Sequence, residues 1–600
     1  MCSVYVEDVV ELLVNVLEDK CPQVKKLSAQ LVVSLADHHK KVLRLKGSVL
    51  AAPLARNVSH RQSPVRAVTV AAIGSLVLAT DGAVFENLAS HMAQRVFDQS
   101  PQVRVKLVEV VGQWVVAMPD RYSYWHKIVP LLLVSFCDEI NSVSSLAVRL
   151  WTEAGAQWLE ENKMSDSRLK EELDFLTSEP EHYPDWVERP GLGCRTLAAR
   201  IQHQVYPSVY NDLKDWQAET RVKAVQLMYV MLYHSEQDIV MHTEKVLNSL
   251  VLAAGDEQEV VRDWTRKCAV VVGFMLPPDT WQPFMVQRLR EAATSQQILV
   301  LAGLVEGTNR RTVTEHQLEE LVMRLAEDEV CCTRDQETLA ELTAFCGALI
   351  KLLDSSLDSM VRSAVKSVKE TDQTLLDNKA EQVEEWNSGE GKIVEIKDEE
   401  EEAAFLCEDK TRHMLECLVK ILLAVESLST DPGLQDTVRG CQERLSRDME
   451  SLSELYRAAL PSLLAQYVQT SNTWSQVSPQ LQIFRRIITQ CGAVTGHFPR
   501  TVITILTSLC SGQDPNTKLQ SFIMLSRLLL NLQQTLDSQG TFSPCLVGVV
   551  REIVSPALKW TAGRTASAIR TAASSSLWSS LQASAASHEN LIRIFQMVTN

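Results

Sequence analysis

The sequence predicts an all-α fold, built as an α-solenoid (superhelix) of stacked helical hairpins. Apolar residues recur at steps of three and four, which is the period of one face of a helix. A short turn sequence returns about every 40 residues, as in repeat proteins. Alternating strand patterns are absent, and only 6% of the 600 residues are aromatic against 46% hydrophobic.

The stretch from Phe85 to Trp114 shows the repeating unit. Its first stripe consists of Phe85, Leu88, Ala89, Met92, Ala93, Val96 and Phe97, and its second of Val103, Leu107, Val110, Val111 and Trp114. Pro101 fits the first turn of the second helix, because its missing N–H would find no partner there. Asp98 can accept main-chain N–H bonds at the turn between them. A pair this small cannot bury both stripes, so it requires copies of itself on either side.

Copies of this turn recur along the chain and place an apolar or β-branched residue before a base, although position 144 is Ser. They centre on Val24-Lys25, Val65-Arg66, Val103-Arg104, Val143, Thr220-Arg221 and Val261-Arg262. The first three steps are 41, 38 and 40 residues, and Thr220 to Val261 is another 41. This period belongs to helical-hairpin solenoids.

Several copies carry an acid six positions before the base. The pairs are Asp19 and Lys25, Asp98 and Arg104, Asp215 and Arg221, and Asp256 and Arg262. This turn resembles that of the HEAT repeat, and the resemblance implies that these eight residues form a structural ladder between neighbouring hairpins. Arg66 and Arg104 are also candidates for partner contact, since second helices line one surface of such a solenoid.

The organisation along the chain follows from where this pattern holds. We predict a first HEAT-repeat solenoid over residues 1–368, with an irregular repeat around 162–190 in which prolines replace the apolar stripe. A first helix is expected after Asp120, and Pro277-Pro278 ends the second run of regular hairpins. A C-terminal HEAT-repeat solenoid is predicted over 412–600, with helical spacing at 415–428, 445–467, 481–488, 502–509 and 519–532.

An acidic segment separates the two predicted solenoids. Residues 369–410 hold fifteen acids and five lysines, so we predict a disordered loop over 369–411 that buries too little surface to offset its ordering entropy. It is either a solvated insertion or a docking tail for a basic partner. Neither end of the chain shows a polar capping repeat, so further repeats are expected beyond both ends.

Charge and composition narrow the classes of partner. The net charge is −16, of which the acidic segment contributes −10. The remainder lacks the clustered Lys and Arg of a nucleic-acid surface. No apolar run approaches the ~18 residues of a membrane span, and no secretory signal begins the chain. Fourteen scattered cysteines without C-x-x-C spacing indicate reduced thiols in a cytoplasmic protein.

A search for chemistry finds no catalytic, cofactor or metal motif. Gly191-Leu192-Gly193-Cys194 lacks the third glycine of a dinucleotide loop, and His38-His39 project to different faces of a helix. Cys331-Cys332 is either redox active or, more commonly, two adjacent buried residues. We therefore expect a protein that is not an enzyme and carries no cofactor. The cluster of Tyr122, Tyr124 and Trp125 is either a partner-binding anchor or packing at a hairpin entrance.

Longer motifs resemble one family. They are the runs 93–98, 101–104, 120–132, 182–184, 192–195, 562–566 and 568–573. These runs are similar to those of the HEAT-repeat family of dynein axonemal assembly factor 5, and the likeness covers most of the chain. The acidic segment is a departure, because family members lack it or have it shorter.

The resemblance implies a cytoplasmic, non-enzymatic factor, located in the dynein axonemal particle. Such a factor pre-assembles the outer and inner dynein arms of motile cilia and acts as a scaffold or co-chaperone. Its implied partners are dynein intermediate and heavy chains and chaperones or other assembly factors, with no nucleic acid and no membrane. A general HEAT-repeat scaffold, such as a transport receptor or a phosphatase scaffold, is the alternative.

Overall fold

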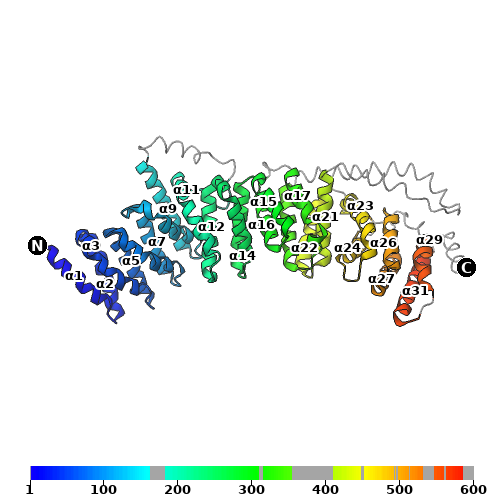
Figure 1. The fold of residues 1–600 in the computed structure, drawn as a ribbon, viewed down its shortest axis with the longest axis horizontal. Helices are drawn as coiled ribbons and strands as arrows, with labels where there is room; N and C mark the ends of the chain where they lie inside the picture. Colours follow the sequence, from blue (N-terminus) through cyan, green and yellow to red (C-terminus); the bar gives the residue numbers. More distant parts are fainter. Residues whose placement is uncertain are drawn as a thin grey trace. The chain divides into compact units, whose positions relative to one another are not determined.

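The structure is a computed structural model, and every element in its described part is helical. It describes residues 2–162, 183–309, 315–353, 410–447, 452–491, 494, 497–512, 514–530, 546–559 and 562–584. No β-strand occurs within these ranges, and within each compact unit the helices form hairpins that stack in chain order (Figure 1). The predicted all-α solenoid is therefore confirmed.

The chain packs as two units, Met1–Leu276 and Pro277–Asn600, divided at the Pro277-Pro278 pair. The acidic segment predicted over 369–411 lies outside the described residues, apart from its last two, with which α21 begins. The boundary at 368 accordingly stays a prediction. No described helix combines the length and the hydropathy required to cross a membrane.

The first unit begins with regular hairpins. Its elements are α1 (Cys2–Leu17), α2 (Pro22–His38), α3 (Lys40–Lys46), η1 (Gly47–Leu50), α4 (Ala51–Asn57), α5 (Ser63–Ala79), α6 (Gly82–Ala93), η2 (Gln94–Phe97), α7 (Pro101–Ala117), α8 (Arg121–Leu133), η3 (Val134–Cys137), α9 (Asn141–Asn162), α11 (Leu192–Asp212), α12 (Ala218–Ser235), η4 (Glu236–His242), α13 (Thr243–Ala254) and α14 (Glu259–Met275). Proline stands in the first turn of α2, α5 and α7, where the helix has no internal acceptor for its N–H.

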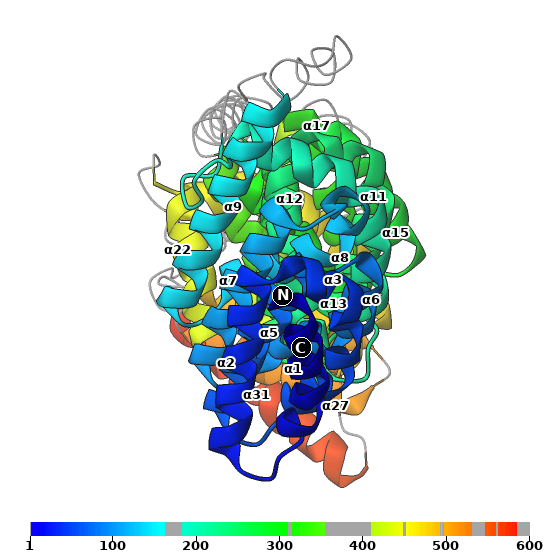
Figure 2. The same cartoon turned by 90° about the vertical axis from the view of Figure 1, so that its left-hand side faces the viewer.

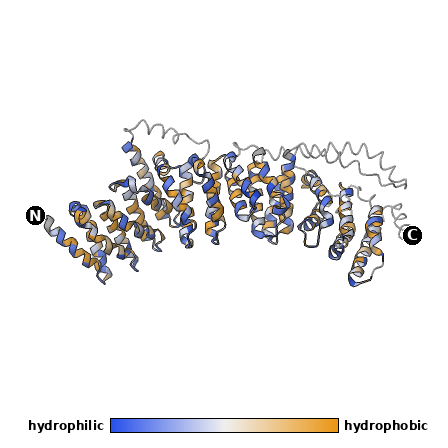
Figure 3. Ribbon diagram, in the orientation of Figure 1, coloured by the Kyte–Doolittle hydropathy of each residue, from blue (hydrophilic) through white to orange (hydrophobic). Residues whose placement is uncertain are grey.

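These hairpins form two layers. The second helices α2, α5, α7 and α9 pack side by side in one row, and α3, α6 and α8 lie in the other (Figure 2). Hydrophobic and hydrophilic residues are interspersed along the helices (Figure 3). Each hairpin therefore buries its stripes against its neighbours.

The hairpin of α6 and α7 confirms most of its predicted stripes. Phe85 and Trp114 are buried, with ring centroids 5.5 Å apart in a T-shaped arrangement. The Trp114 indole donates to the main-chain oxygen of Gly74 on α5 at 3.1 Å. The expectation for Phe97 was wrong, since that side chain is 39% exposed. The chain tightens into the 3₁₀ turn η2, whose shorter period rotates Phe97 off the apolar face.

The irregular repeat is closed by an unusually tight helix contact. The helix α11 packs directly on α9. In a regular stack this place beside α9 would belong to the next second helix, which is α12. A Cβ on Gly193 would lie 2.0 Å from the main-chain oxygen of Gly155. Only glycine fits this crossing, which accounts for Gly193 without a nucleotide.

A buried histidine ties α12 to α9 across the same irregular repeat. Trp151 Nε1 donates to His234 Nε2 at 3.0 Å, and His234 Nδ1 donates to the main-chain oxygen of Val230 at 2.7 Å. Burial lowers the pKa of His234 to about 4. The ring is therefore neutral at pH 7 and is held in a single tautomer.

The second unit is also a series of packed helices. Its elements are α15 (Pro278–Glu291), α16 (Ser295–Gly307), α17 (Glu315–Leu325), α18 (Asp328–Cys331), a helix over 336–353, α21 (Lys410–Leu428), α22 (Pro432–Leu445), α23 (Leu452–Thr470), η5 (Ser471–Thr473), α24 (Pro479–Gln490), α26 (Pro499–Ser511), α27 (Pro515–Leu530), α29 (Leu546–Val549), η7 (Val550–Val554), α30 (Ser555–Leu558) and α31 (Arg564–Ser584). The stripe predicted over 445–467 was misread, because Leu445 ends α22 and α23 begins at Leu452.

We expect Trp114→Ala to lower the free energy of unfolding of the first unit by about 3–5 kcal/mol, because it empties a large buried site. Urea unfolding followed by hydrogen exchange at the α5 and α7 amides measures the change. Trp216→Ala is the matched control, since Trp216 is 85% exposed and its removal leaves no cavity. Equal losses in the two variants would contradict the assigned packing.

Gly193→Ala should lower the thermal unfolding midpoint, because the added methyl group collides with main-chain atoms that cannot rotate away. Gly191→Ala, two residues earlier, is the control, since a Cβ there meets nothing within 4 Å. Differential scanning calorimetry compares the two variants. A midpoint for Gly193→Ala equal to that of Gly191→Ala would show that α9 and α11 do not cross this closely.

Candidate functional site: the repeat turns and the Tyr122 cluster

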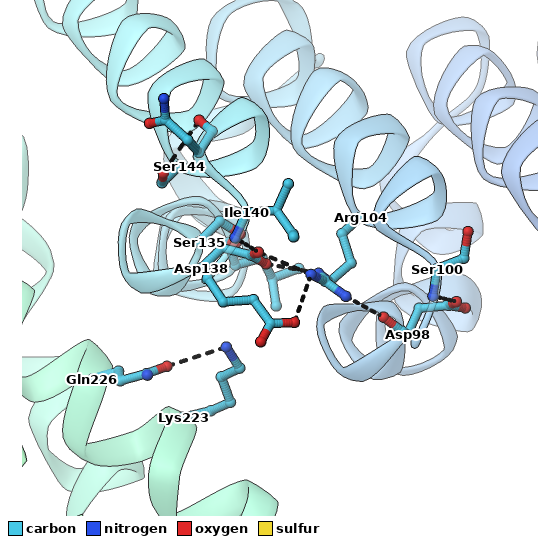
Figure 4. A network of polar contacts seen from close by, with 12 residues as sticks. Asp98, Ser100, Arg104, Ser135, Asp138, Ile140, Ser144, Lys223 and Gln226 are labelled. Carbon is cyan, nitrogen blue, oxygen red and sulfur yellow. Dashed lines mark hydrogen bonds and ion pairs between the residues drawn. The ribbon is translucent and has the colours of Figure 1, made fainter. Parts of the chain in front are cut away.

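The repeat turns place each base between two copies of the turn. Within its own copy, Arg104 Nη1 donates to the main-chain oxygen of Asp98 at 2.8 Å, six positions earlier. Its Nε and Nη2 donate to the carboxylate of Asp138 in the next copy, at 2.7 and 2.9 Å (Figure 4). The six-residue spacing thus brings the base to the main-chain oxygen of the acid in its own turn. The carboxylate of that acid pairs with the base of the preceding repeat.

The same bidentate arginine–carboxylate contact recurs at Arg66 and at Arg221. Arg66 Nε and Nη2 donate to the Asp98 carboxylate at 2.7 and 2.6 Å. Arg221 Nη2 donates to Asp256 Oδ1 at 2.9 Å, and its Nη1 donates to the main-chain oxygen of Asp215 at 3.0 Å. The fixed fork of a guanidinium matches both carboxylate oxygens, so each contact sets the spacing of two hairpins.

Electrostatics favours the charged form of these carboxylates. Burial by itself would raise the pKa of Asp98, but hydrogen bonds from Arg66 and the Ser100 N–H, with the charge of Arg66, outweigh it and lower the pKa. Asp256 follows the same balance, with Arg221 and the Gln258 N–H as donors. Both carboxylates are therefore ionised at neutral pH.

Other predicted ladder residues make different contacts. Lys25 Nζ donates to the main-chain oxygen of Leu17 at 3.0 Å and to Asn57 Oδ1 at 2.6 Å. Asp19 accepts the N–H of Cys21 within its own turn. Arg262 donates to the main-chain oxygen of Asp256 at 2.7 Å. In the first repeat a neutral amide, Asn57, thus stands where the later repeats have an aspartate, and the sequence spacing contained no signal for it.

A lysine from α12 lies near the turn whose own repeat lacks a base at position 144 (Figure 4). The Asp138 carboxylate accepts hydrogen bonds from the Ile140 N–H at 3.0 Å and from the Arg104 guanidinium. The repeat of Asp138 has Ser144 in place of a base. Lys223 comes up beside this acidic turn and donates to Gln226 Oε1 at 3.1 Å (Figure 4). Burial lowers the pKa of Lys223, and the charge of Asp138 opposes that shift. The spacing pattern predicts a copy of the turn at 138–143 but gives Asp138 no ladder partner, because position 144 is Ser. It misses Lys223, because that residue lies two positions after Arg221, the base of its own repeat.

The predicted aromatic cluster has one accessible member. Trp125 is 4% exposed and donates to the main-chain oxygen of Val115 at 3.3 Å, and Tyr124 packs on Phe85 with centroids 4.9 Å apart. Tyr122 is 52% exposed, stacks edge-on to Trp125 at 4.5 Å and lies under the Arg121 guanidinium. Tyr124 and Trp125 thus pack at the entrance of the hairpin, and the ring of Tyr122 is accessible to solvent.

The surroundings of Tyr122 contain little room for a small molecule. A pocket beside Trp125, lined also by Arg121, Trp158 and Glu161, measures about 10 Å³. That volume admits about one water molecule. Arg121 pairs with Glu161 across the pocket at 2.5 Å. The surface around Tyr122 is therefore charged and aromatic, with room for about one water molecule.

A buried polar centre in the second unit had no signal in the sequence. The Glu426 carboxylate accepts from Arg486 at 2.7 Å, from Gln490 at 2.8 Å and from Gln442 at 3.2 Å. Burial would raise the pKa of Glu426, yet these donors lower it. Because the donors come from α22 and α24, the centre fixes both helices against α21.

The remaining candidate residues are placed as follows. His38 Nδ1 donates to the main-chain oxygen of Ser34 at an exposed helix end, 2.8 Å away. Cys331 and Cys332 are buried free thiols, with sulfurs 3.8 Å apart. Burial raises the pKa of Cys194, Cys491 and Cys510, which keeps these thiols protonated at neutral pH.

Known proteins match the chain over nearly its whole length. Residues 1–171 match a family model described as dynein axonemal assembly factor 5-like TPR repeats, and residues 181–371 match the HEAT-repeat domain of dynein axonemal assembly factor 5. The dynein axonemal assembly factor 5 of Mus musculus is 32% identical over 575 residues, which are 96% of this chain and 61% of that protein. That of Homo sapiens is 31% identical over 578 residues, with the same shares.

The chain belongs to the dynein axonemal assembly factor 5 family. It spans about three fifths of the length of the curated relatives that it matches. The steps of 38 to 41 residues are closer to the HEAT period than to the 34 residues of a TPR. Family membership thus agrees with the HEAT-like repeat predicted from spacing.

Solved structures resemble the chain only distantly. A designed armadillo repeat protein matches at 12% identity and a TM-score of 0.23, over 44% of this chain and 98% of its own. Importin beta matches at 13% identity and a TM-score of 0.20, over 98% of this chain and 80% of its own. Neither likeness bears on the function of this chain.

We expect Asp138→Asn to lower the free energy of unfolding by about 3 kcal/mol, because it leaves the nearly buried Arg104 guanidinium without its carboxylate. Glu139→Gln is the matched control: Glu139 also contacts Arg104, at 3.4 Å, but is 82% exposed, so its loss costs at most about 1 kcal/mol. Chemical denaturation measures both variants. An equal loss of unfolding free energy in Glu139→Gln would contradict the assignment of Asp138 as the main partner of Arg104.

Proposed function

We propose that this chain is a non-enzymatic cytoplasmic scaffold, acting within the dynein axonemal particle. It would hold axonemal dynein chains while the outer and inner arms of motile cilia are pre-assembled. The supporting observation is its similarity to proteins named dynein axonemal assembly factor 5 across 96% of its length. The partners proposed are dynein intermediate or heavy chains, with chaperones or other assembly factors acting alongside.

The geometry supports holding over catalysis. The guanidinium groups of Arg66, Arg104 and Arg221 are engaged with carboxylates of the following turn, and the pocket beside Trp125 is too small for a substrate. A stack of hairpins supplies a long surface of repeated helices, on which many weak contacts can add up around a large client. No cofactor and no nucleic acid are part of this proposal.

Tyr122 is the residue that we propose for partner contact. Its ring is accessible, and Trp125 and Arg121 fix its orientation, so little side-chain entropy would be lost on binding. Arg66 and Arg104, the other candidates, have their guanidinium groups committed to Asp98 and Asp138. We therefore assign them to the ladder and leave partner contact to Tyr122.

Affinity capture of the tagged chain from differentiating ciliated cells tests the function. We expect dynein intermediate or heavy chains in the bound fraction, and a decrease of about tenfold in their affinity for Tyr122→Ala, which is about 1.4 kcal/mol. Tyr5→Ala is the control, since Tyr5 is 72% exposed on another hairpin. Cross-linking mass spectrometry of the same fraction locates the contacts.

Two results would count against the proposal in different ways. Dynein chains missing from the wild-type fraction, with transport cargo or a phosphatase in their place, would favour the general HEAT-repeat scaffold. Normal capture by Tyr122→Ala would retain the function and remove Tyr122 from the binding surface.

A further inference from the structure

A cluster of potential metal ligands lies in the second unit, where α18 ends. The carboxylate of Asp328 and the sulfurs of Cys331 and Cys332 all lie within 4.8 Å of one another. Both cysteines are buried and Asp328 is half-buried, and both cysteines are free thiols. We propose that these three side chains bind one zinc ion.

The spacing of the sulfurs fits tetrahedral zinc. Two thiolates bound at about 2.3 Å to a tetrahedral centre lie about 3.8 Å apart. Cys331 Sγ and Cys332 Sγ are 3.8 Å apart. Adjacent residues normally point away from each other, but the helix ends at Cys331 and Cys332 leaves helical geometry, which brings the two side chains together.

A lysine makes the site electrically suitable for a dication. Lys420 of α21 is 9% exposed, and its Nζ lies 2.7 Å from Asp328 Oδ1. Zinc with two thiolates and one carboxylate carries a single negative charge, which the ammonium group neutralises. Binding replaces two thiol protons by one Zn²⁺, and both protons leave to solvent, so the net charge of the cluster is zero before and after. Burial of an unpaired charge is thereby avoided.

Neighbouring groups orient the carboxylate of Asp328. Gln480 Nε2 of α24 donates to Asp328 Oδ2 at 3.0 Å, which orients the carboxylate as outer partners do in metal sites. The three side chains leave the fourth position of a tetrahedral zinc to a water molecule.

Binding would tie the α18 turn to the helices behind it. Asp328 already contacts α21 through Lys420 and α24 through Gln480. Zinc would fix both cysteines to that carboxylate and so stabilise the turn between α18 and the helix over 336–353. This inference does not depend on the proposed function, because it concerns one structural site.

Zinc titration of the full chain, reduced and stripped of metal, tests the site against a chromophoric chelator. We expect the wild type to bind one more equivalent than the double variant Cys331→Ser/Cys332→Ser, and its thermal midpoint to rise with zinc. Cys510→Ser is the control, because Cys510 is buried and lies outside the cluster. It should bind as the wild type does.

A measurement on the wild type covers the case in which the double variant does not fold. X-ray absorption at the zinc edge should show two sulfur ligands at about 2.3 Å together with oxygen. Cobalt in place of zinc should give a thiolate-to-cobalt charge-transfer band. Zinc ligated only by nitrogen and oxygen, or equal stoichiometry in the wild type and a folded double variant, would overturn the proposal.

Discussion

Apolar contact between neighbouring hairpins is the interaction on which the described helices depend. A hairpin such as α6 and α7 has stripes on both helices and is too small to cover them, so Trp114 completes its burial against α5. The gain of about 25 cal/mol per Å² of buried apolar surface is therefore shared between repeats. Loss of one repeat uncovers the stripes of the next, and stability spreads along the stack from neighbour to neighbour.

The ladder adds position to this apolar attraction. Apolar packing alone permits one hairpin to slide or rotate on another, because it has no direction. The fork of Arg104 removes that freedom, since it requires the main-chain oxygen of Asp98 and both carboxylate oxygens of Asp138 at once. A buried ion pair gives modest net stability and is costly to break, so its contribution is to the register of the repeats.

The irregular repeat shows how the stack continues where its pattern fails. Without a base at position 144, the turn at Asp138 is approached by Lys223, and the pair of Gly155 and Gly193 allows α11 to lie directly on α9. The bond from Trp151 to His234 then joins α12 to the same helix. Three local contacts thus replace one regular hairpin contact.

The sequence by itself determined the all-α class, the period of about 40 residues and the turns at which second helices begin. These features follow from local rules: helical spacing of apolar residues, proline in the first helical turn, and an aspartate that caps its own turn. The long motifs determined the family as well.

Only the tertiary structure decided the partners of each charge, because six-residue spacing relates a base to its own turn and carries no information about the next repeat. It also decided that Phe97 is exposed, that Asn57 replaces an acid, and that Asp328, Cys331 and Cys332 lie near Lys420. Such contacts join residues far apart in the chain, and they are set by how helices pack, which no local pattern records.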